Sequence, residues 1–382
     1  MDFQLSEEQE LIKQTVRDFA EREVKPLAKE LDEKGEFSVK LTKRLGELGL
    51  MGMYLPEKYG GQGLDTLSYI IAVEELARID SSQAATLAAH NSLGIGPIYY
   101  YGTEEQKLKY LPNLCTGKAL WAFGLTEPDA GSDSRGTKTK AKLENREWTI
   151  NGSKIFITNG ASELAAGATV QAVTKTDGNK KEFTTIIVEK GTLGYTQLAM
   201  HGKMMWRASD TAELYFDDCK VPEENLLGKI GEGSKIMLST LDNGRLSIGA
   251  MGLGLAQGAF ELALKYSKER KQFGKPISHF QIIAFNLADM ALKIELARNL
   301  LYKACWLKDN NKPFGKEAAM SKLYCSEIAK DVADKAVQIH GGYGLMKDYD
   351  IERFYRDQRL LQIGEGTSEI QKLVISRMIL NE

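Results

Sequence analysis

The chain has 382 residues, of which 43% are hydrophobic and 27% charged, and this is enough for two or three domains with cores of their own. The composition excludes a disordered chain and one built mainly of membrane spans. Lysine and arginine number 50 against 52 aspartate and glutamate, so the net charge of −2 gives no general field that attracts nucleic acid or anionic lipid. We therefore expect neither nucleic acid nor a membrane as a partner.

The cysteines and the first residues indicate the compartment. The four cysteines lie far apart without the paired spacing of a zinc site or a redox dithiol, so no metal site is predicted and a reducing compartment fits best. They are Cys115, Cys219, Cys305 and Cys325. From Asp2 onward the start is acidic and polar, unlike a secretory signal or a transit peptide. These features predict a cytoplasmic location.

Residues 1–120 carry helical patterns and predict an all-helical first domain. Ser6 and Gln9 form a capping box, apolar residues recur at helical spacing, and Pro26 is expected to close the first helix. Further short helices are predicted over 41–48, 70–79, 83–93 and 104–114, separated by glycine and proline. Asn91 is more typical of a hydrogen-bonded amide than of a catalyst. Contact of Asn91 or His90 with a substrate stays open.

The period changes to two-residue alternation near Trp121, and residues 121–232 predict a small β domain. Strands over 148–150 and 154–158 flank Asn151 and Gly152, a pair that favours the tight turn of a β-hairpin. A second hairpin is predicted from 170–176 and 183–189, with its turn over 177–179. A further strand over 211–216 ends before Pro222. The domain is expected to be barrel-like.

Helical patterns return after Gly233 and continue to the end. Long helices are predicted over 236–273, 280–301 and 318–339, the last ending at a glycine pair, and a terminal helix follows a capping box of Ser368 and Gln371. Long helices joined by short loops are typical of a four-helix bundle, here over 233–382. The fold class is thus mainly α with a central β domain.

Four stretches carry residues suited to chemistry. The loop 123–133 is rich in glycine and hydroxyl groups, 270–274 and 338–344 close long helices with a cation, aromatics and glycines, and 363–370 holds Glu365 between two glycines. Such loops can present backbone N–H groups, a cation and a stacking ring to a phosphate or a flat ligand. Taken singly, each is equally well a turn, a helix cap or a solvated carboxylate. The chain has neither a G-x-G-x-x-G fingerprint nor a P-loop.

Taken together and in order, these stretches resemble the acyl-CoA dehydrogenase family of flavoproteins along almost the whole chain. The matching motifs are 123–133, 156–159, 207–209, Leu241 and Asp242 with Arg245, 270–274, 338–344 and 365–367. Each motif is weak alone, whereas the ordered set is specific. The resemblance implies FAD as the cofactor and a homotetramer as the assembly.

The resemblance also implies which residues contact the ligands. The flavin and its nearby chain would be surrounded by Leu125, Thr126, Gly131, Ser132, Phe156 and Thr158. The FAD of a neighbouring subunit would be reached by Arg270, Phe273, Gln338 and Gly342, with Thr367 and Glu369 near its polar part. The acyl-CoA substrate would be contacted by Ser132, Asp242, Arg245, Gly364 and Gly366.

The implied reaction converts an acyl-CoA thioester to its 2,3-enoyl form. Glu365 is expected to remove the α proton while the β hydride passes to the flavin, and burial should raise the pKa of its carboxyl toward the working pH. The thioester oxygen would accept hydrogen bonds from the backbone N–H of Glu365 and a flavin ribityl hydroxyl. Some relatives carry the base on the long helix, at the position of Gly244 here, so Glu365 is the candidate. Electrons would pass to an electron-transfer flavoprotein.

Two departures from the family pattern concern the acyl group. Gly364 stands where many short- and medium-chain relatives have an aromatic residue, and Met204, Met205 and Trp206 replace small or aliphatic residues. These changes indicate either a pocket for a branched, cyclic or aryl-bearing acyl group or neutral repacking. Three other functions stay open: an acyl-CoA oxidase, an enoyl-CoA reductase of an electron-bifurcating complex, and a non-catalytic CoA-binding helical assembly protein.

Overall fold

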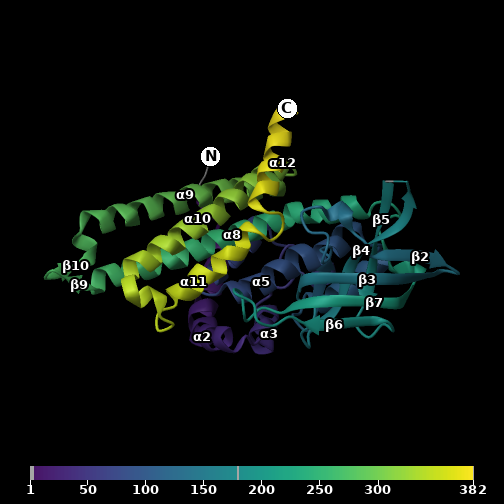
Figure 1. The fold of residues 1–382 in the computed structure, drawn as a ribbon, viewed down its shortest axis with the longest axis horizontal. Coiled ribbons are helices and arrows are strands. Elements are labelled where there is room, and N and C mark those ends of the chain that lie inside the picture. Colours follow the sequence, from purple (N-terminus) through teal and green to yellow (C-terminus); the bar gives the residue numbers. More distant parts are fainter. Residues whose placement is uncertain (1–3, 179, 382) are drawn as a thin grey trace.

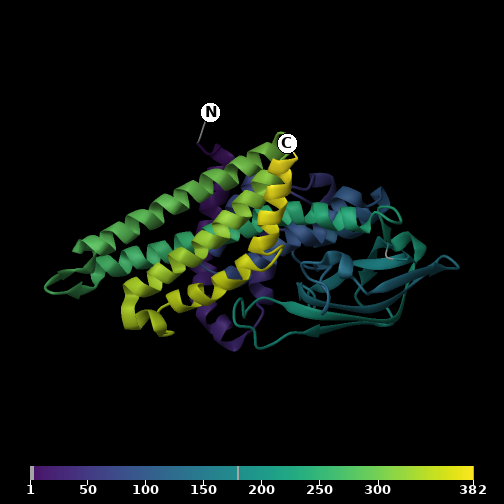
Figure 2. The same cartoon turned by 45° about the horizontal axis from the view of Figure 1, so that its top comes forward.

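The computed structural model describes residues 4–178 and 180–381, and it has a β domain beside a bundle of long helices (Figure 1). The N-terminal helices pack against both, as the two views in Figures 1 and 2 show. The predicted fold class, mainly α with a central β domain, is confirmed. The order of the three parts along the chain is also as predicted.

The described part of the N-terminal region has helices and no strand, with a long loop between α3 and α4. Its α-helices are α1 (Glu7–Phe19), α2 (Lys25–Lys34), α3 (Val39–Glu47), α4 (Thr66–Ala77), α5 (Ser81–Ala89), α6 (Gly96–Tyr101) and α7 (Glu104–Leu114). The capping box of Ser6 and Gln9 is present, with hydrogen bonds of 3.0 and 3.2 Å. The helix predicted over 83–93 is α5 continued by a π-helical segment, His90–Ile95.

Pro26 does not close the first helix, and that prediction was wrong. A π-helical turn, Ala20–Val24, joins α1 to α2, and Pro26 lies in the first turn of α2. A proline in this first turn is tolerated because its fixed φ of about −65° suits a helix. The helical run ends instead at Gly35, whose φ of 64° suits glycine.

The β domain is one mixed sheet. Its strands are β1 (Leu120–Gly124), β2 (Lys140–Glu144), β3 (Glu147–Thr158), β4 (Ala165–Asp177), β5 (Lys180–Glu189), β6 (Tyr195–Ala199), β7 (Thr211–Pro222) and β8 (Leu226–Leu227). They lie in the order β6-β7-β3-β2-β4-β5-β8, and β1 pairs in parallel with β4. A single residue pair joins β2 to β4, and buried side chains of the strands form a core of their own.

The hairpin predicted at Asn151 and Gly152 was wrong, because both residues lie inside the continuous strand β3. The register with β7 shifts between Ile150 and Gly152, which marks a bulge, and a Cβ at Gly152 would lie 2.5 Å from the Thr139 side chain. The actual turn is formed by Asn145 and Arg146, which join β2 to β3 with φ of 50° and 64°.

The second predicted hairpin is formed by β4 and β5, with Asp177 paired to Lys180. Asn179 of its predicted turn lies outside the described residues, and Gly178 has a φ of 56°. The strand predicted over 211–216 is the first half of β7, which continues to Pro222. These three segments were therefore correctly predicted as strands, but each predicted strand is shorter than the one in the structure.

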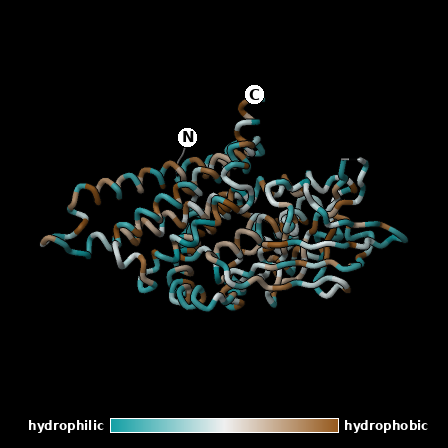
Figure 3. Tube along the Cα trace, in the orientation of Figure 1, coloured by the Kyte–Doolittle hydropathy of each residue, from teal (hydrophilic) through white to brown (hydrophobic). Residues whose placement is uncertain are grey.

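The C-terminal region is built on three long helices. Its elements are α8 (Gly233–Glu269), β9 (Lys271–Gln272), β10 (Lys275–Pro276), α9 (Gln281–Asp309), α10 (Gly315–His340), α11 (Ile351–Asp357) and α12 (Ser368–Leu380). The first long helix was predicted to reach Phe273 but ends at Glu269, since residues after it form the β9–β10 hairpin. The short helix α11 was not predicted. Hydrophobic and hydrophilic residues alternate along the helices (Figure 3).

Helix α8 is the central element of the bundle. It packs against α10, α4 and α9, and its glycines allow close approach: a Cβ at Gly254 or Gly258 would lie 2.2 or 2.1 Å from a backbone oxygen of the α4 end. Among the described residues it is the one helix with the length and apolar character of a membrane span, but 78% of its apolar window is buried within the protein. This burial is that of a core helix.

Candidate active site

Glu365 lies in a left-handed turn between the bundle helices. Its φ is 52° and that of Gly366 is 92°, both outside the range that most residues adopt easily. The Gln371 side-chain amide donates to the carbonyls of Glu365 and Gly366, at 3.2 and 2.9 Å, and the ammonium of Lys322 on α10 donates to the Gly366 carbonyl at 2.7 Å. Backbone strain held by several hydrogen bonds is characteristic of functional sites.

The cap of the terminal helix is one residue earlier than predicted. Thr367 is the N-cap of α12, and its hydroxyl accepts from the Ile370 N–H at 3.2 Å. Ser368 instead donates to Glu327 at 2.6 Å, and Gln371 binds the turn as described above. Thr367 and the exposed Glu369 therefore lie at the start of α12, directly after the Glu365 turn.

Glu365 is half-buried as a whole residue, but one oxygen of its carboxylate is fully buried and unpaired within the described part of the chain. Its Oε2 atom is inaccessible to solvent and has no hydrogen-bond partner among the described residues. Burial raises the pKa of Glu365 to about 7, against the opposing charges of Lys322 and Arg245. A buried carboxylate with a free oxygen and a pKa near neutrality has the properties of a general base.

Helix α8 passes directly beneath this carboxylate. A Cβ at Gly244 would lie 1.8 Å from Glu365 Oε2 and 3.1 Å from Leu93 Cδ2. Any side chain at position 244 would therefore displace the Glu365 carboxylate. The space available here admits a carboxylate from the turn or a side chain from the helix, but not both.

Asp242 and Arg245 lie on α8, and the charge of Arg245 acts on Glu365. Arg245 is buried and donates from Nη1 to Asp242, while its Nε has no partner among the described residues. Burial raises the pKa of Asp242, and the charge of Arg245 opposes that shift. A hollow of about 660 Å³ borders Asp242. Its lining includes Tyr54, Tyr99, Tyr100, Lys308 and Lys312. Thus α8 joins the candidate base to a cavity with both polar and aromatic walls.

Thr126 and Phe156 are brought together where β1 leaves the sheet. The Ile155 N–H donates to the Thr126 carbonyl at 3.0 Å. Phe156 is 65% exposed with a φ of 60°, at a bulge between Lys154 and Ile157 in the pairing with β7. A bulge of this kind turns a side chain out of the sheet, here an apolar ring. Thr158 follows, half-buried, at the end of β3.

A buried ion pair fixes the loop that follows β1. Lys154 is 1% exposed and donates to Glu127 at 2.7 Å and to the Leu125 carbonyl at 3.2 Å. Glu127 also accepts the N–H groups of Lys138 and Thr139, which closes the loop. The loop tip containing Gly131 and Ser132 is exposed, and a Cβ at Gly131 would meet no atom within 4 Å. The backbone at the tip is thus open to a ligand.

Arg270, Phe273, Gln338 and Gly342 lie at the far end of the bundle from the β domain, near the β9–β10 hairpin in Figure 1. Phe273 is 92% exposed with a φ of 51°, and Gln338 and Gly342 are also exposed. Arg270 lies 5.5 Å from the centre of the Tyr343 ring and borders a hollow of about 470 Å³. One chain does not bring these residues to Thr126 or Glu365.

These two groups of residues fit FAD if each binds a different part of it. The β-domain group offers an exposed ring and an open glycine loop to a flat ring system, and the far group offers a guanidinium, a protruding phenylalanine and the open glycines Gly341 and Gly342. The two groups lie at opposite ends of the chain in Figure 1, so one chain alone does not place both against the same FAD. The residue chemistry therefore fits the cofactor.

Three residues whose role was open have structural partners. The Asn91 side chain donates to the Leu50 and Leu87 carbonyls and accepts from the Gly52 N–H, and His90 contacts the Leu114 carbonyl at 3.0 Å. The Trp206 ring is 5% exposed and donates to the Asp357 carbonyl at 3.0 Å, within the core. These contacts account for all three without a ligand.

The sequence analysis did not identify Lys322 as part of the site. It also predicted Gln371 as a member of a capping box with Ser368, whereas Gln371 binds the carbonyls of Glu365 and Gly366. The signal for Lys322 was a charged residue on the buried face of α10, in register with Ala318, Cys325 and Ala329. A lysine in such a row is rarely accidental, since lysine is seldom fully buried.

Family models match nearly the whole chain in three parts. The N-terminal domain of acyl-CoA dehydrogenase matches residues 6–118, its middle domain 122–219, and its C-terminal domain 231–380.

Individual relatives are similar over their full length. The short-chain specific acyl-CoA dehydrogenase of Clostridium acetobutylicum is 49% identical, with 99% of this chain and 100% of the relative covered. The acryloyl-CoA reductase (NADH) of Anaerotignum propionicum is 47% identical, with 100% and 96% covered.

Solved structures agree with these relatives. A chain in the structure described as the electron transferring flavoprotein of Acidaminococcus fermentans, concerned with flavin-based electron bifurcation, superposes with a TM-score of 0.97 at 48% identity, with 100% of both chains covered. The acyl-CoA dehydrogenase of Bacillus anthracis complexed with FAD superposes with a TM-score of 0.93 at 38% identity, with 99% of this chain and 67% of that chain covered.

The fold, the buried carboxylate and these matches define the class of the protein, which is an oxidoreductase. More narrowly, the chain belongs to the acyl-CoA dehydrogenase family.

Proposed function

We propose that the protein catalyses the α,β-dehydrogenation of an acyl-CoA thioester, with Glu365 as the base. The observation that carries the proposal is the buried Glu365 carboxylate, with a free Oε2 atom and a pKa raised to about 7. A base of this pKa is largely ionised just above neutral pH and still basic enough to accept a proton. The family match and the short-chain dehydrogenase relative support the reaction class.

The proton step follows from the position of the carboxylate. Glu365 takes the α proton on a carboxylate oxygen, and the electron pair of the broken C–H bond forms the new double bond as the β hydride leaves. The Glu365 N–H can donate to the thioester oxygen and stabilise its developing negative charge. The cofactor is FAD, which accepts the hydride when bound.

The chain's residues divide between two FAD sites in this proposal. Within one subunit the flavin is held by Leu125, Thr126, Gly131, Ser132, Phe156 and Thr158. The FAD of the neighbouring subunit is reached by Arg270, Phe273, Gln338 and Gly342, with Thr367 and Glu369 near its polar part. The CoA substrate is held by Asp242 and Arg245, and its acyl part lies near Ser132, Gly364 and Gly366.

A homotetramer, a cytoplasmic location and the domain limits 1–120, 121–232 and 233–382 complete the proposal. Support for an oligomer comes from apolar side chains of α9 that are exposed in one chain: Ile282, Phe285, Leu292 and Leu296 are each more than half exposed. The electron acceptor we propose is an electron-transfer flavoprotein, supported by the similar chain in the flavoprotein structure.

Glu365→Gln tests the proposed base directly. The variant keeps the size of the side chain but cannot accept a proton, so flavin reduction by a short acyl-CoA should slow by at least ~10²-fold while FAD content is unchanged. Anaerobic stopped-flow bleaching of the flavin measures this rate. Near-normal reduction would move the base to another residue.

The reverse reaction is a second candidate, favoured by the reductase relative at 47% identity. The same base would return a proton to the α carbon. Anaerobic assays of an acyl-CoA and its enoyl-CoA, with an electron-transfer flavoprotein as the partner, compare the two directions. Reoxidation by air in the same instrument distinguishes an acyl-CoA oxidase. Because the chain is an oxidoreductase, the non-catalytic alternative is set aside.

The acyl group is a separate proposal, based on Gly364. A Cβ there would make only ordinary contacts with Leu360, at 3.6 Å or more, so the position leaves room beside the base. We keep the prediction of a branched, cyclic or aryl-bearing substrate, although the named relatives include a short-chain enzyme. Trp206 lies in the core and gives this prediction no support.

A further inference from the structure

Helix α10 presents a row of polar side chains to the segment that carries Glu365. Ser326 donates to the Leu361 carbonyl at 2.8 Å, and Glu327 accepts from Gln362 at 2.8 Å and from Ser368 at 2.6 Å. Lys322, one turn earlier, donates to the Gly366 carbonyl at 2.7 Å. The segment is thus attached to α10 before, at and after the Glu365 turn, which we define as residues 364–366.

Lys322 differs from the other members of this row because it carries a charge in a fully buried place. Its exposed fraction is 0%, and burying an ammonium is costly unless an opposite charge or a hydrogen bond compensates for it. The Gly366 carbonyl supplies one hydrogen bond, and Glu365 supplies the principal opposite charge that acts on it.

We propose that Lys322 is a positioning residue for the Glu365 base, holding the Glu365 turn by its hydrogen bond to Gly366 and stabilising the ionised carboxylate by its charge. The inference rests on the proposed function of Glu365. A hydrogen bond to the carbonyl next to a left-handed residue opposes relaxation of the turn, since rotation of the peptide would break it. The charge acts independently, by favouring the ionised form of the base before substrate deprotonation.

The charged and titratable groups around the pair come from several elements. Arg245 on α8 and Lys322 on α10 both oppose the rise in the Glu365 pKa. Tyr69 on α4 is a buried phenol whose pKa is raised by burial and, to a smaller extent, by the charge of Glu365. Burial lowers the pKa of Lys322 to about 8, and the positive charge of Arg245 contributes to this lowering. The negative charge of Glu365 opposes this lowering, and those of Glu327 and Glu369 oppose it more weakly. Lys322 is therefore protonated at neutral pH.

The test is the pH profile of flavin reduction in the holoenzyme, with a short acyl-CoA as the substrate. Lys322→Met removes both the hydrogen bond and the charge, so the limb of the profile at acid pH should move to higher pH by about one unit. The rate at its alkaline plateau should fall about tenfold, because the turn is released. Lys322→Gln can still donate to Gly366 without a charge, so it should show the shift with a plateau closer to wild type. Lys322→Arg keeps the charge and should show the smallest shift.

Ser326→Ala is the matched control, since it removes a neighbouring uncharged attachment of the same segment from the same helix. It should lower thermal stability without moving the profile. If Lys322→Met and Lys322→Gln lower stability but leave the profile where it is in wild type, Lys322 is only a structural residue and the inference is overturned. If Lys322→Met does not fold, Lys322→Gln alone decides between these outcomes.

A second readout needs no turnover. Because the folded pKa of Glu365 lies above its ordinary value of 4.5, the folded protein binds more protons than the unfolded chain, and stability falls as the pH rises from about 4.5 to about 7. Glu365→Gln removes this loss, so its midpoint of thermal unfolding should exceed that of wild type increasingly across the same range.

In the Lys322→Gln background the gain from Glu365→Gln should be larger and extend to higher pH, because no ammonium at position 322 then favours the ionised carboxylate. An equal gain in both backgrounds contradicts the inference. Failure of the proposed function would give a different result from failure of this inference. In that case acyl-CoA would still reduce the flavin of Glu365→Gln at a near-normal rate, whereas the stability measurements need no turnover and would still report on Lys322.

Discussion

The contact between Gly244 and Glu365 is the tightest constraint at the scale of single residues. A methyl group at position 244 falls 1.8 Å from the carboxylate oxygen, and the end of a glutamate side chain can rotate away from it. The variant Gly244→Ala should therefore fold and bind FAD but hold its base out of position. Since a misplacement of about 1 Å can cost on the order of 10²-fold, the rate of flavin reduction should fall by about that factor.

Gly315→Ala is the control for placing alanine in a helix, because a Cβ there meets only the Met378 side chain, at 3.3 Å. Stopped-flow bleaching and the ratio of FAD to protein measure both variants. An unchanged rate in Gly244→Ala would show that the Glu365 carboxylate acts from a different position.

A second prediction for a single residue concerns Gly364 and the choice of acyl group. Gly364→Tyr would fill the space beside the base, so kcat/KM should fall for bulky acyl-CoA substrates while that for butyryl-CoA is spared or improved. Steric exclusion by a ring exceeds the effect of one methylene, about 1–3 kcal/mol, so preference should shift by more than about tenfold. A panel of straight, branched, cyclic and aryl-propionyl thioesters measures it. Wild-type preference for butyryl-CoA, unchanged in the variant, contradicts the pocket hypothesis.

The β9–β10 hairpin is the element that reaches out of the chain. Phe273 at its turn is almost fully exposed, and Arg270 at its base borders a hollow beside the glycines that close α10. An exposed aromatic residue of this size on a short hairpin indicates a contact with another molecule. In the proposed function that molecule is the FAD of a neighbouring subunit.

Arg270→Ala tests this use of the hairpin. Loss of the guanidinium should weaken FAD retention and oligomer stability together, because a ligand shared by two subunits stabilises both. Absorbance gives the FAD content, and light scattering after gel filtration gives the mass. Arg146→Ala, at an exposed β-turn, should change neither. A stable monomer with a full complement of FAD would refute a shared site.

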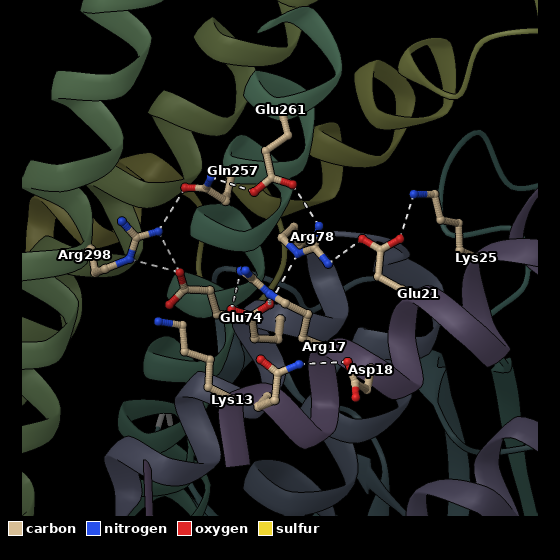
Figure 4. Close-up of polar contacts among 12 residues, drawn as sticks. Lys13, Arg17, Asp18, Glu21, Lys25, Glu74, Arg78, Gln257, Glu261 and Arg298 are labelled. Atoms are coloured by element: carbon tan, nitrogen blue, oxygen red, sulfur yellow. Dashed lines mark hydrogen bonds and ion pairs between the residues drawn. The ribbon is translucent and has the colours of Figure 1, made fainter. Parts of the chain in front are cut away.

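At the scale of the whole molecule, an ion-pair network joins the N-terminal helices to the bundle (Figure 4). Arg78, at the end of α4, contacts Glu21 at 2.7 Å, Glu75 at 3.3 Å and Glu261 of α8 at 2.8 Å. Glu74 beside it accepts from Arg298 of α9 at 2.8 Å. Three parts of the chain are thus linked through neighbouring residues of α4.

Arg78→Leu should destabilise the protein by about 3 kcal/mol, since it leaves the buried Glu75 with less compensation. Arg22→Ala, which removes an exposed pair with Asp18, should cost no more than about 0.5 kcal/mol. Midpoints of thermal unfolding at pH 7 compare the two. Equal effects would mean that the network adds no more than ordinary surface pairs.

The sequence by itself determined the type and order of most of the elements and offered Glu365 as the candidate base. Because helices and strands have different hydrophobic periods, the change from helix to strand near Trp121 and the return to helix after Gly233 could be predicted from the sequence. The glycines around Glu365 predicted a turn, and the structure has a turn there, in which Glu365 and Gly366 have positive φ values. Local pattern suffices for features that depend on neighbouring residues.

Tertiary contacts decided the rest. Asn151 and Gly152 favour a turn locally, yet pairing with β7 and the approach of Thr139 keep them inside β3. The contact of Gly244 with Glu365 Oε2 and the hydrogen bond of Lys322 to Gly366 join residues 44 or more positions apart in the chain. No local periodicity encodes such contacts, because they exist only once α8 and α10 have packed around the turn.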